Sequence, residues 1–172
     1  MTVELWSGQS YGAVVSVNVE YEVAPPGSND HLGDAWALKE RIRERDGVLR
    51  QRHGFFSNAY RRSTVHLLRT EDALVGFASV RRDGYVLFLA VAPEFRGEGF
   101  GERLVAAAAE DHDVVTCHAR TTNENAVDFY QHLGFTIDRQ VGGYYEDGGD
   151  AYYLKLGGND GITARISRLF GR

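Results

Sequence analysis

Three glycines stand at alternate positions in the stretch VAPEFRGEGFGERLV, residues 91–105, directly after an apolar run. They are Gly97, Gly99 and Gly101, and Arg96 precedes them. Glycine loses more backbone freedom on folding than any other residue, so three of them in one strand-to-helix junction need a physical reason. Two reasons fit: a loop with positive φ angles, or a backbone cradle whose N–H groups approach a phosphate with no Cβ in the way.

Two familiar phosphate-binding motifs do not fit this stretch. A P-loop needs a lysine directly after its last glycine, and none follows here. A dinucleotide fingerprint needs the spacing GxGxxG in the first strand-helix unit of a domain. Here Glu102 stands where the third glycine is required, and several strands precede the stretch. The pattern that remains is Arg96-x-x-Gly99-x-Gly101 at the end of an apolar strand.

A second group of candidate residues lies in DVVTCHAR, residues 113–120. Side chains alternate between the two faces of a strand. One face of this strand carries Thr116, His118 and Arg120, and the other carries Val115, Cys117 and Ala119. The first face is polar in the middle of a domain, which predicts that it lines a cleft. An imidazole, with a pKa near ~6.5, can act there as a general base, and a packed strand histidine is the alternative.

Composition limits what the protein binds. The chain has 172 residues with 43% hydrophobic content, a net charge of −5 and Cys117 as its one cysteine. These values predict one domain in a reducing cytoplasm, with no nucleic-acid partner. No apolar run reaches the ~18 residues of a membrane span, and the N-terminus lacks a signal-peptide pattern, so no membrane partner is expected. The histidines lack metal-ligand spacing, and we expect no bound metal.

Hydrophobic periodicity places these motifs on strands and helices. Strands are expected at 14–23, 64–70, 73–82, 84–91, 113–120, 135–141 and 151–156, and helices at 31–46, 99–111 and 123–134, with a short helix within 47–63. This order predicts an α/β (α+β) fold, a mixed sheet with helices on both faces. Thr121 and Glu124 have capping-box spacing, and Gly134 closes the helix that follows. We assign 14–156 to one domain, 1–13 to an N-terminal extension and 157–172 to a helical C-terminal tail.

With two motifs in order, the sequence resembles the GCN5-related N-acetyltransferase (GNAT) family over residues 14–156. That family carries Gln/Arg-x-x-Gly-x-Gly/Ala before a helix, matched here by the glycine stretch. It also carries Asn-x-x-Ala-x-x-Leu/Phe-Tyr-x-x-x-Gly-Phe. The matching residues are Asn123, Ala126, Phe129, Tyr130, Gly134 and Phe135. The resemblance implies a GNAT fold with a mixed six- to seven-stranded central sheet, and acetyl-CoA as cosubstrate.

The resemblance also implies a set of cosubstrate-binding positions. These are Leu89, Val91, Arg96, Gly97, Glu98, Gly99, Phe100, Gly101, Asn123 and Tyr130. Successive amides of the glycine stretch would hold the pyrophosphate, and an amide near Val91 would polarise the thioester carbonyl. Asn123 would bond the pantetheine or cap its helix. Tyr130 would give a proton to the departing thiolate, unless it is merely packed on an apolar helix stripe.

The base and the acceptor site follow from a closer likeness to N-terminal acetyltransferases of ribosomal proteins. Those carry Leu-Glu-Val-Arg where this chain has residues 117–120, so His118 stands where their glutamate acts as base. We expect the pKa of His118 between about 6 and 7.5, lowered by Arg120 nearby. Tyr144, Tyr145 and Arg120 are expected to bind the acceptor, although an exposed hairpin loop also explains the two tyrosines.

The predicted function is acetyl-CoA-dependent N-acetylation of a primary amine by direct transfer in a ternary complex. A protein or peptide N-terminal α-amine is the first acceptor considered. The alternatives are a small amine such as an aminoglycoside, polyamine or amino acid, or a non-catalytic coenzyme A-binding module. The protein is expected to be a monomer or homodimer.

Overall fold

The computed structural model describes residues 2–5 and 15–157, so the predicted helical tail after Gly157 lies outside the described residues. The strands are β1 (Thr2–Leu5), β2 (Val15–Asn18), β3 (Glu20–Ala24), β4 (Thr64–Arg69), β5 (Leu74–Val80), β6 (Val86–Val91), β7 (Val114–Arg120), β8 (Thr136–Val141) and β9 (Ala151–Gly157). The helices are α1 (Leu32–Asp46), α2 (His53–Arg62), the 3-10 turn η1 (Pro93–Phe95), α3 (Phe100–Glu110) and α4 (Glu124–His132).

These elements belong to two compact units, each described by itself. Of the described residues, the first contains 2–5, 15–79 and 88–104, and the second contains 80–87 and 105–157. The division passes through the β5–β6 hairpin, whose turn belongs to the second unit, and through α3. The expected strand at 14–23 is two strands, β2 and β3, separated at the buried Val19.

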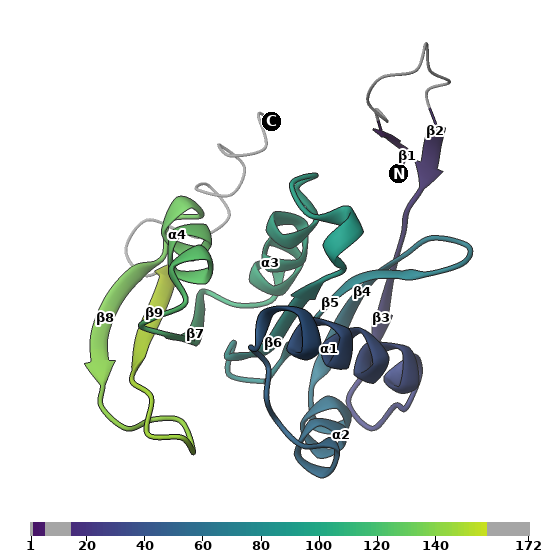
Figure 1. Ribbon diagram of the computed structural model, residues 1–172. Helices are drawn as coiled ribbons and strands as arrows, with labels where there is room; N and C mark the ends of the chain where they lie inside the picture. The colour runs from purple at the N-terminus through teal and green to yellow at the C-terminus, as the bar shows by residue number, and fades with distance from the viewer. Residues whose placement is uncertain (1, 6–14, 158–172) are drawn as a thin grey trace. The chain divides into compact units, whose positions relative to one another are not determined.

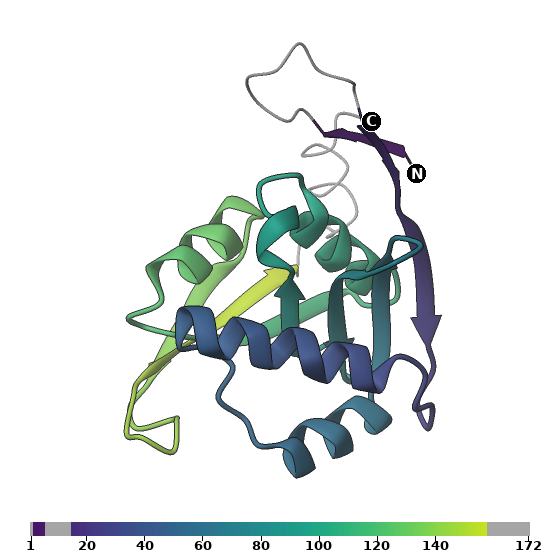
Figure 2. The same ribbon diagram turned by 45° about the vertical axis from the view of Figure 1, so that its right-hand side comes forward.

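The sheet of the first unit has the strand order β3-β4-β5-β6, and α1 and α2 lie on one face of it (Figures 1 and 2). Phe56 of α2 is fully buried and contacts the rings of Phe77 and Phe88 at centroid distances of 6.0 and 5.0 Å. Gly76, next to Phe77, faces the opposite side of the sheet. A Cβ at Gly76 would lie 3.2 Å from the side chain of Leu104, near the start of α3. Helices therefore cover both faces of this sheet, because alternate residues of β5 pack in opposite directions.

Helix α1 has the predicted apolar stripe, in which Ala35, Leu38, Lys39 and Ile42 are buried. Lys39 is an unusual member of this stripe because a buried ammonium needs hydrogen-bond partners. It finds them in the carbonyl of Gln51 and the carboxylate of Glu40, and it lies 4.6 Å from the centroid of the Trp36 ring. The buried lysine thus ties α1 to the segment that leads into α2.

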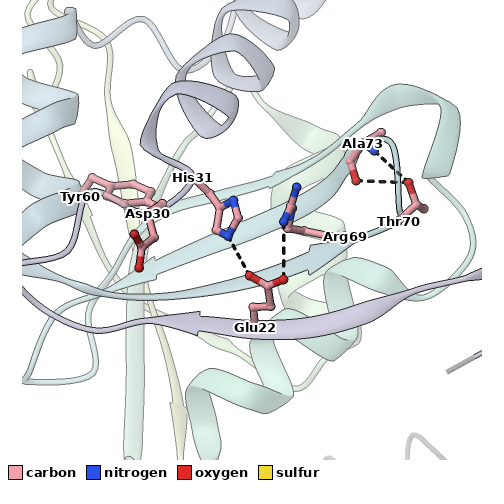
Figure 3. Close-up of polar contacts among 7 residues, drawn as sticks. All are labelled: Glu22, Asp30, His31, Tyr60, Arg69, Thr70 and Ala73. Carbon is pink, nitrogen blue, oxygen red and sulfur yellow. Dashed lines mark hydrogen bonds and ion pairs between the residues drawn. The ribbon is translucent and has the colours of Figure 1, made fainter.

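The start of α1 is held by a carboxylate on the edge strand (Figure 3). Glu22 of β3 accepts a 2.7 Å hydrogen bond from His31, which adopts a left-handed conformation (φ 61°) directly before the helix. The other carboxylate oxygen of Glu22 lies 3.5 Å from Arg69 of β4. Tyr60 of α2 donates to the carbonyl of Asp30. These contacts fix the turn between β3 and α1.

The second unit has a three-stranded antiparallel sheet in the order β7-β9-β8, with α4 beside it (Figures 1 and 2). Asn123 caps α4, since its side chain accepts from the amide of Ala126 at 3.2 Å. The capping residue is therefore Asn123 and not Thr121. Gly134 ends the helix with φ 100°, as predicted, because only glycine adopts that conformation without cost.

The α/β class and the helices on both faces are confirmed, but the strands divide differently from the expectation. Seven strands form one sheet of four and one of three rather than a single six- to seven-stranded sheet. Within the second unit, the edge of β7 that does not pair with β9 makes one parallel bridge, between Tyr85 and Thr116. A periodic sequence predicts strands, but backbone pairing decides where a sheet is interrupted.

Candidate functional site

The glycine stretch forms a loop and helix start in the first unit. Gly97 and Gly99 have φ angles of 82° and 84°, and a Cβ at Gly97 would meet open space. The carbonyl of Gly99 accepts the amide of Arg103 at 3.2 Å, which is the first bond of α3. The amides of Phe100 and Gly101 therefore precede that bond and belong to the unpaired donors of a helix N-terminus. The loop combines positive φ with an open, amide-rich surface that suits an anion.

The side chain of Arg96 is engaged within the protein. Its Nη2 lies 2.9 Å from the carboxylate of Asp46, the last residue of α1, and its Nε donates to the carbonyl of Val91 at 3.3 Å. A second ion pair joins Arg41 of α1 to Glu94 of η1 at 2.6 Å. The side chain of Arg96 thus supports the loop, and the group that Arg96 offers to an anion is its backbone amide.

The cradle gives a first prediction. Gly99→Val should weaken acetyl-CoA binding by at least about tenfold, or ~1.4 kcal/mol, because a branched side chain stands beside the amides. Valine is also strained at φ 84°, so Gly27→Val is the matched control: Gly27 has φ 92° and open space around it, in the turn before α1. Calorimetric titration and melting of both variants separate the effects. Equal affinities in the two variants would mean that the glycines serve only the turn.

His118 lies at the centre of an aromatic cluster in the second unit. Its Nδ1 is 2.7 Å from the hydroxyl of Tyr85, and its ring stacks on Tyr144 at 4.1 Å with an interplanar angle of 11°. The ring of Tyr153, the cross-strand partner of His118 on β9, is 5.0 Å from the imidazole. Arg139 of β8 lies over the Tyr153 ring, 4.6 Å from its centroid. The hydroxyls of Tyr85 and Tyr144 are 3.2 Å apart.

This surrounding lowers the pKa of His118. Burial is the larger cause because it disfavours the charged imidazolium, and the positive charge of Arg139 adds to it. The expected direction is correct, but the charge responsible is on Arg139 rather than Arg120. Burial also raises the pKa of Tyr85 far above its usual range, so its phenol stays protonated. The pair joins an imidazole that is neutral at physiological pH to a neutral hydroxyl.

Tyr130 is 8% exposed and packs against the rings of Phe129 and Phe135, 5.2 and 5.1 Å away. Burial raises its pKa well above the usual value, and the nearby Cys117 thiol adds to this shift. Cys117 is itself buried, and burial raises its pKa to about 12, so it is an uncharged thiol. Tyr130 therefore remains a proton donor, in surroundings that also suit a packed core tyrosine.

The β8–β9 loop carries Tyr144, which is 44% exposed, and Tyr145 beside it in an edge-to-face contact of 5.0 Å. Burial raises the pKa of Tyr145 to about 12. Arg120 of β7 reaches into this loop, where its Nη1 donates to Asp147 at 3.0 Å and its Cζ lies 3.9 Å from the centroid of the Tyr145 ring. The structure thus brings the predicted base and the predicted acceptor residues together in one unit.

The remaining predicted positions lie on the expected elements. Leu89 and Val91 are on β6 and Asn123 caps α4, while Glu98 lies within the glycine loop of the first unit. The sequence reasoning missed Tyr85 and Arg139 as partners of His118. No pattern along the strands indicates either partner, because strand register brings both to the histidine: Tyr85 bridges Thr116, two residues before His118, and Arg139 is opposite Tyr153.

Among residues 2–5 and 15–157, no group of three or more His, Cys, Asp or Glu side chains is placed to hold a metal ion. None of the helices in the same ranges has the length and apolarity needed to cross a membrane.

Comparison with known proteins places these motifs in context. A family model described as an acetyltransferase (GNAT) domain matches residues 61–137. N-alpha-acetyltransferase 30 of Xenopus laevis is 39% identical over 80 residues, which make up 44% of this chain and 29% of that protein. The chain thus spans under a third of the length of this curated relative.

Two solved structures share the fold. Ard1 of Thermoplasma volcanium has a TM-score of 0.66 at 22% identity, over 80% of this chain and 96% of that one. Naa50 of Arabidopsis thaliana, in complex with the bisubstrate analogue CoA-Ac-MVNAL, has a TM-score of 0.61 at 22% identity, over 83% and 100% of the two chains. At these identities the likeness establishes the fold, and the residues of the site carry the chemical argument.

Proposed function

We propose that this chain, in which residues 61–137 match an acetyltransferase (GNAT) domain, transfers the acetyl group of acetyl-CoA to the α-amine of a protein or peptide N-terminus. The observation that carries this proposal is the 2.7 Å contact between His118 and Tyr85, with Tyr144 of the β8–β9 loop stacked on the same imidazole. A relative that is named an N-alpha-acetyltransferase and a fold neighbour bound to a peptide-containing bisubstrate analogue support the acceptor class.

The donor is held at the glycine cradle of the first unit. The amides of residues 97–101 would bind its pyrophosphate, since they are the anion-binding donors of a helix N-terminus. Arg96 keeps this loop in place through Asp46 and the carbonyl of Val91. Acetyl-CoA supplies the thioester, and the chain supplies its orientation.

His118 acts as the general base in this proposal. Its Nδ1 is engaged with Tyr85, so Nε2 is the nitrogen that takes a proton from the ammonium form of the acceptor. With Nε2 basic, the Nδ1–H donates to the Tyr85 hydroxyl, which in turn donates to Tyr144. Tyr130, whose pKa burial raises so that the phenol stays protonated, supplies the proton that the thiolate of coenzyme A takes up. The transfer is direct: the neutral amine nitrogen attacks the thioester carbon, the carbon–sulfur bond breaks, and the N–H proton that the new amide nitrogen loses restores the Tyr130 hydroxyl.

A turnover screen tests the function. Acetyl-CoA consumption and free thiol release are measured across peptides with different N-termini and across polyamines, aminoglycosides and amino acids. Acetylated peptide α-amine, identified by mass spectrometry, supports the proposal. Turnover with small amines alone would mean that the acceptor is a small amine and not a peptide. Coenzyme binding without any turnover would indicate a coenzyme A-binding module.

A further inference from the structure

The loop that carries the two tyrosines, residues 144–149 and hereafter the tyrosine loop, has a compact backbone. The amide of Gly148 donates to the carbonyl of Tyr145 at 2.9 Å, and the amide of Tyr145 donates to the carbonyl of Gly149 at 3.1 Å. Gly148 has a φ of 82°, which closes the turn. These bonds shape the loop internally, but they do not by themselves fix where its tyrosines stand.

One side chain from outside the loop, Arg120 of β7, contacts it at two points. Its Nη1 donates to Oδ1 of Asp147 at 3.0 Å, and its guanidinium lies over the face of Tyr145 at 3.9 Å. The same Oδ1 accepts the amide of Gly149 at 3.0 Å. The arginine therefore joins a charge pair, an aromatic face and a backbone turn, and its planar, rigid donor fork suits such a junction.

The side chain of Arg120 occupies the space that a side chain at position 149 would need. A Cβ at position 149 would collide with Nη1 of Arg120 and would lie 3.0 Å from Oδ1 of Asp147. The atom it meets first is the end of a flexible side chain, so alanine here would displace the guanidinium rather than the backbone. The absence of a side chain at this position makes room for the arginine to reach Asp147.

The position of the tyrosine loop matters for the site that the proposed function uses. Tyr144 stacks on His118 and its hydroxyl meets that of Tyr85, so a displaced loop moves an aromatic wall of the base. Arg120 itself is 20% exposed in its side chain and is engaged with Asp147 and Tyr145.

We propose that Arg120 is a positioning residue for the acceptor: it holds the tyrosine loop against the His118 cluster, and Gly149 provides the space for this contact. The proposal rests on the proposed function for its meaning in catalysis, and on the loop geometry alone for its structural part. Preorganisation of this kind lowers the cost of binding, because the loop needs no ordering when the acceptor arrives.

The experiment compares Arg120→Gln, Gly149→Ala and the double variant Arg120→Gln/Gly149→Ala in the full chain. Each is assayed for the KM of the best peptide from the screen, the KM of acetyl-CoA and kcat. Hydrogen exchange of the tyrosine loop is followed without substrates. The two single variants should raise the acceptor KM by about tenfold, leave the acetyl-CoA KM within about twofold, and speed exchange in the loop.

Gly149→Ala keeps the positive charge, so its agreement with Arg120→Gln separates loop positioning from attraction of the acceptor by charge. The double variant should be no worse than Arg120→Gln alone, because without the guanidinium the alanine at position 149 meets no arginine. Arg82→Gln, which removes an exposed arginine in the β5–β6 turn, is the control for net charge.

Three results overturn the proposal. A raised acceptor KM in Arg120→Gln with unchanged loop exchange and a normal Gly149→Ala enzyme would mean that the arginine contacts the acceptor itself. Unchanged exchange in every variant would mean that the loop holds its position without Arg120. Equal effects on both KM values would indicate a general structural role. If the wild-type protein turns over no amine, the proposed function fails, whereas the exchange measurement still decides whether Arg120 holds the loop.

Discussion

Replacing the Tyr130 hydroxyl by hydrogen, in Tyr130→Phe, is expected to lower kcat by roughly 10²-fold while acetyl-CoA affinity stays within about twofold. The reason is that the phenol, whose pKa burial raises, is held protonated and can give its proton to the leaving thiolate. The ring still packs against Phe129 and Phe135, so the core is retained. Steady-state kinetics with calorimetric affinity of the same preparation measure both quantities.

The matched control is a second buried tyrosine with a bonded hydroxyl. Tyr60 is 1% exposed and donates to the carbonyl of Asp30 in the first unit. Tyr60→Phe should lower the melting temperature, since it leaves that carbonyl without its donor, but it should leave kcat unchanged. If Tyr130→Phe behaves in the same way, with normal turnover and reduced stability, Tyr130 is a core residue and the proton comes from another donor.

The second large effect is expected at the base. His118→Gln should slow kcat/KM by about 10²-fold or more and remove the acidic limb of its pH profile. The limb reflects loss of the neutral imidazole as pH falls through its pKa. Burial and Arg139 lower that pKa, so the neutral form persists to a lower pH and the wild-type limb should lie below the ordinary histidine value of 6.5. Initial rates from pH 5 to 9 measure it.

Two further variants test the assignment of this limb. Arg139→Gln removes a positive charge, which makes protonation of His118 easier, so the limb should move to higher pH while the enzyme stays active. His118→Glu should restore much of the rate and move the limb to lower pH, because a carboxyl has a pKa near ~4.3.

The acceptor amine also titrates, and this must be separated from the base. The profile is therefore repeated with amines of different pKa. A limb that follows the amine, together with a fully active His118→Gln enzyme, would reduce His118 to a packed strand residue.

The sequence by itself determined most of the elements and the resemblance to a family. Period-two and helical patterns located the strands and helices from β3 to β9, because local backbone geometry makes side-chain periodicity visible without any contact. The glycine stretch and the Asn123–Phe135 motif carry the resemblance to the GNAT acetyltransferases, whose domain model matches residues 61–137. The alternation on β7 also placed His118 and Arg120 on the polar side, since it depends only on position along one strand.

Only the tertiary structure decided the partners of these residues. It paired His118 with Tyr85, turned Arg120 toward Asp147 and Tyr145, and made Arg139 the charge that lowers the pKa of His118. It also divided seven strands between two sheets. These outcomes depend on the register between strands far apart in the chain, and on which partner lies within reach of each guanidinium in the folded protein. A pattern along one strand carries no information about either, because the free energy that selects them comes from contacts across the fold.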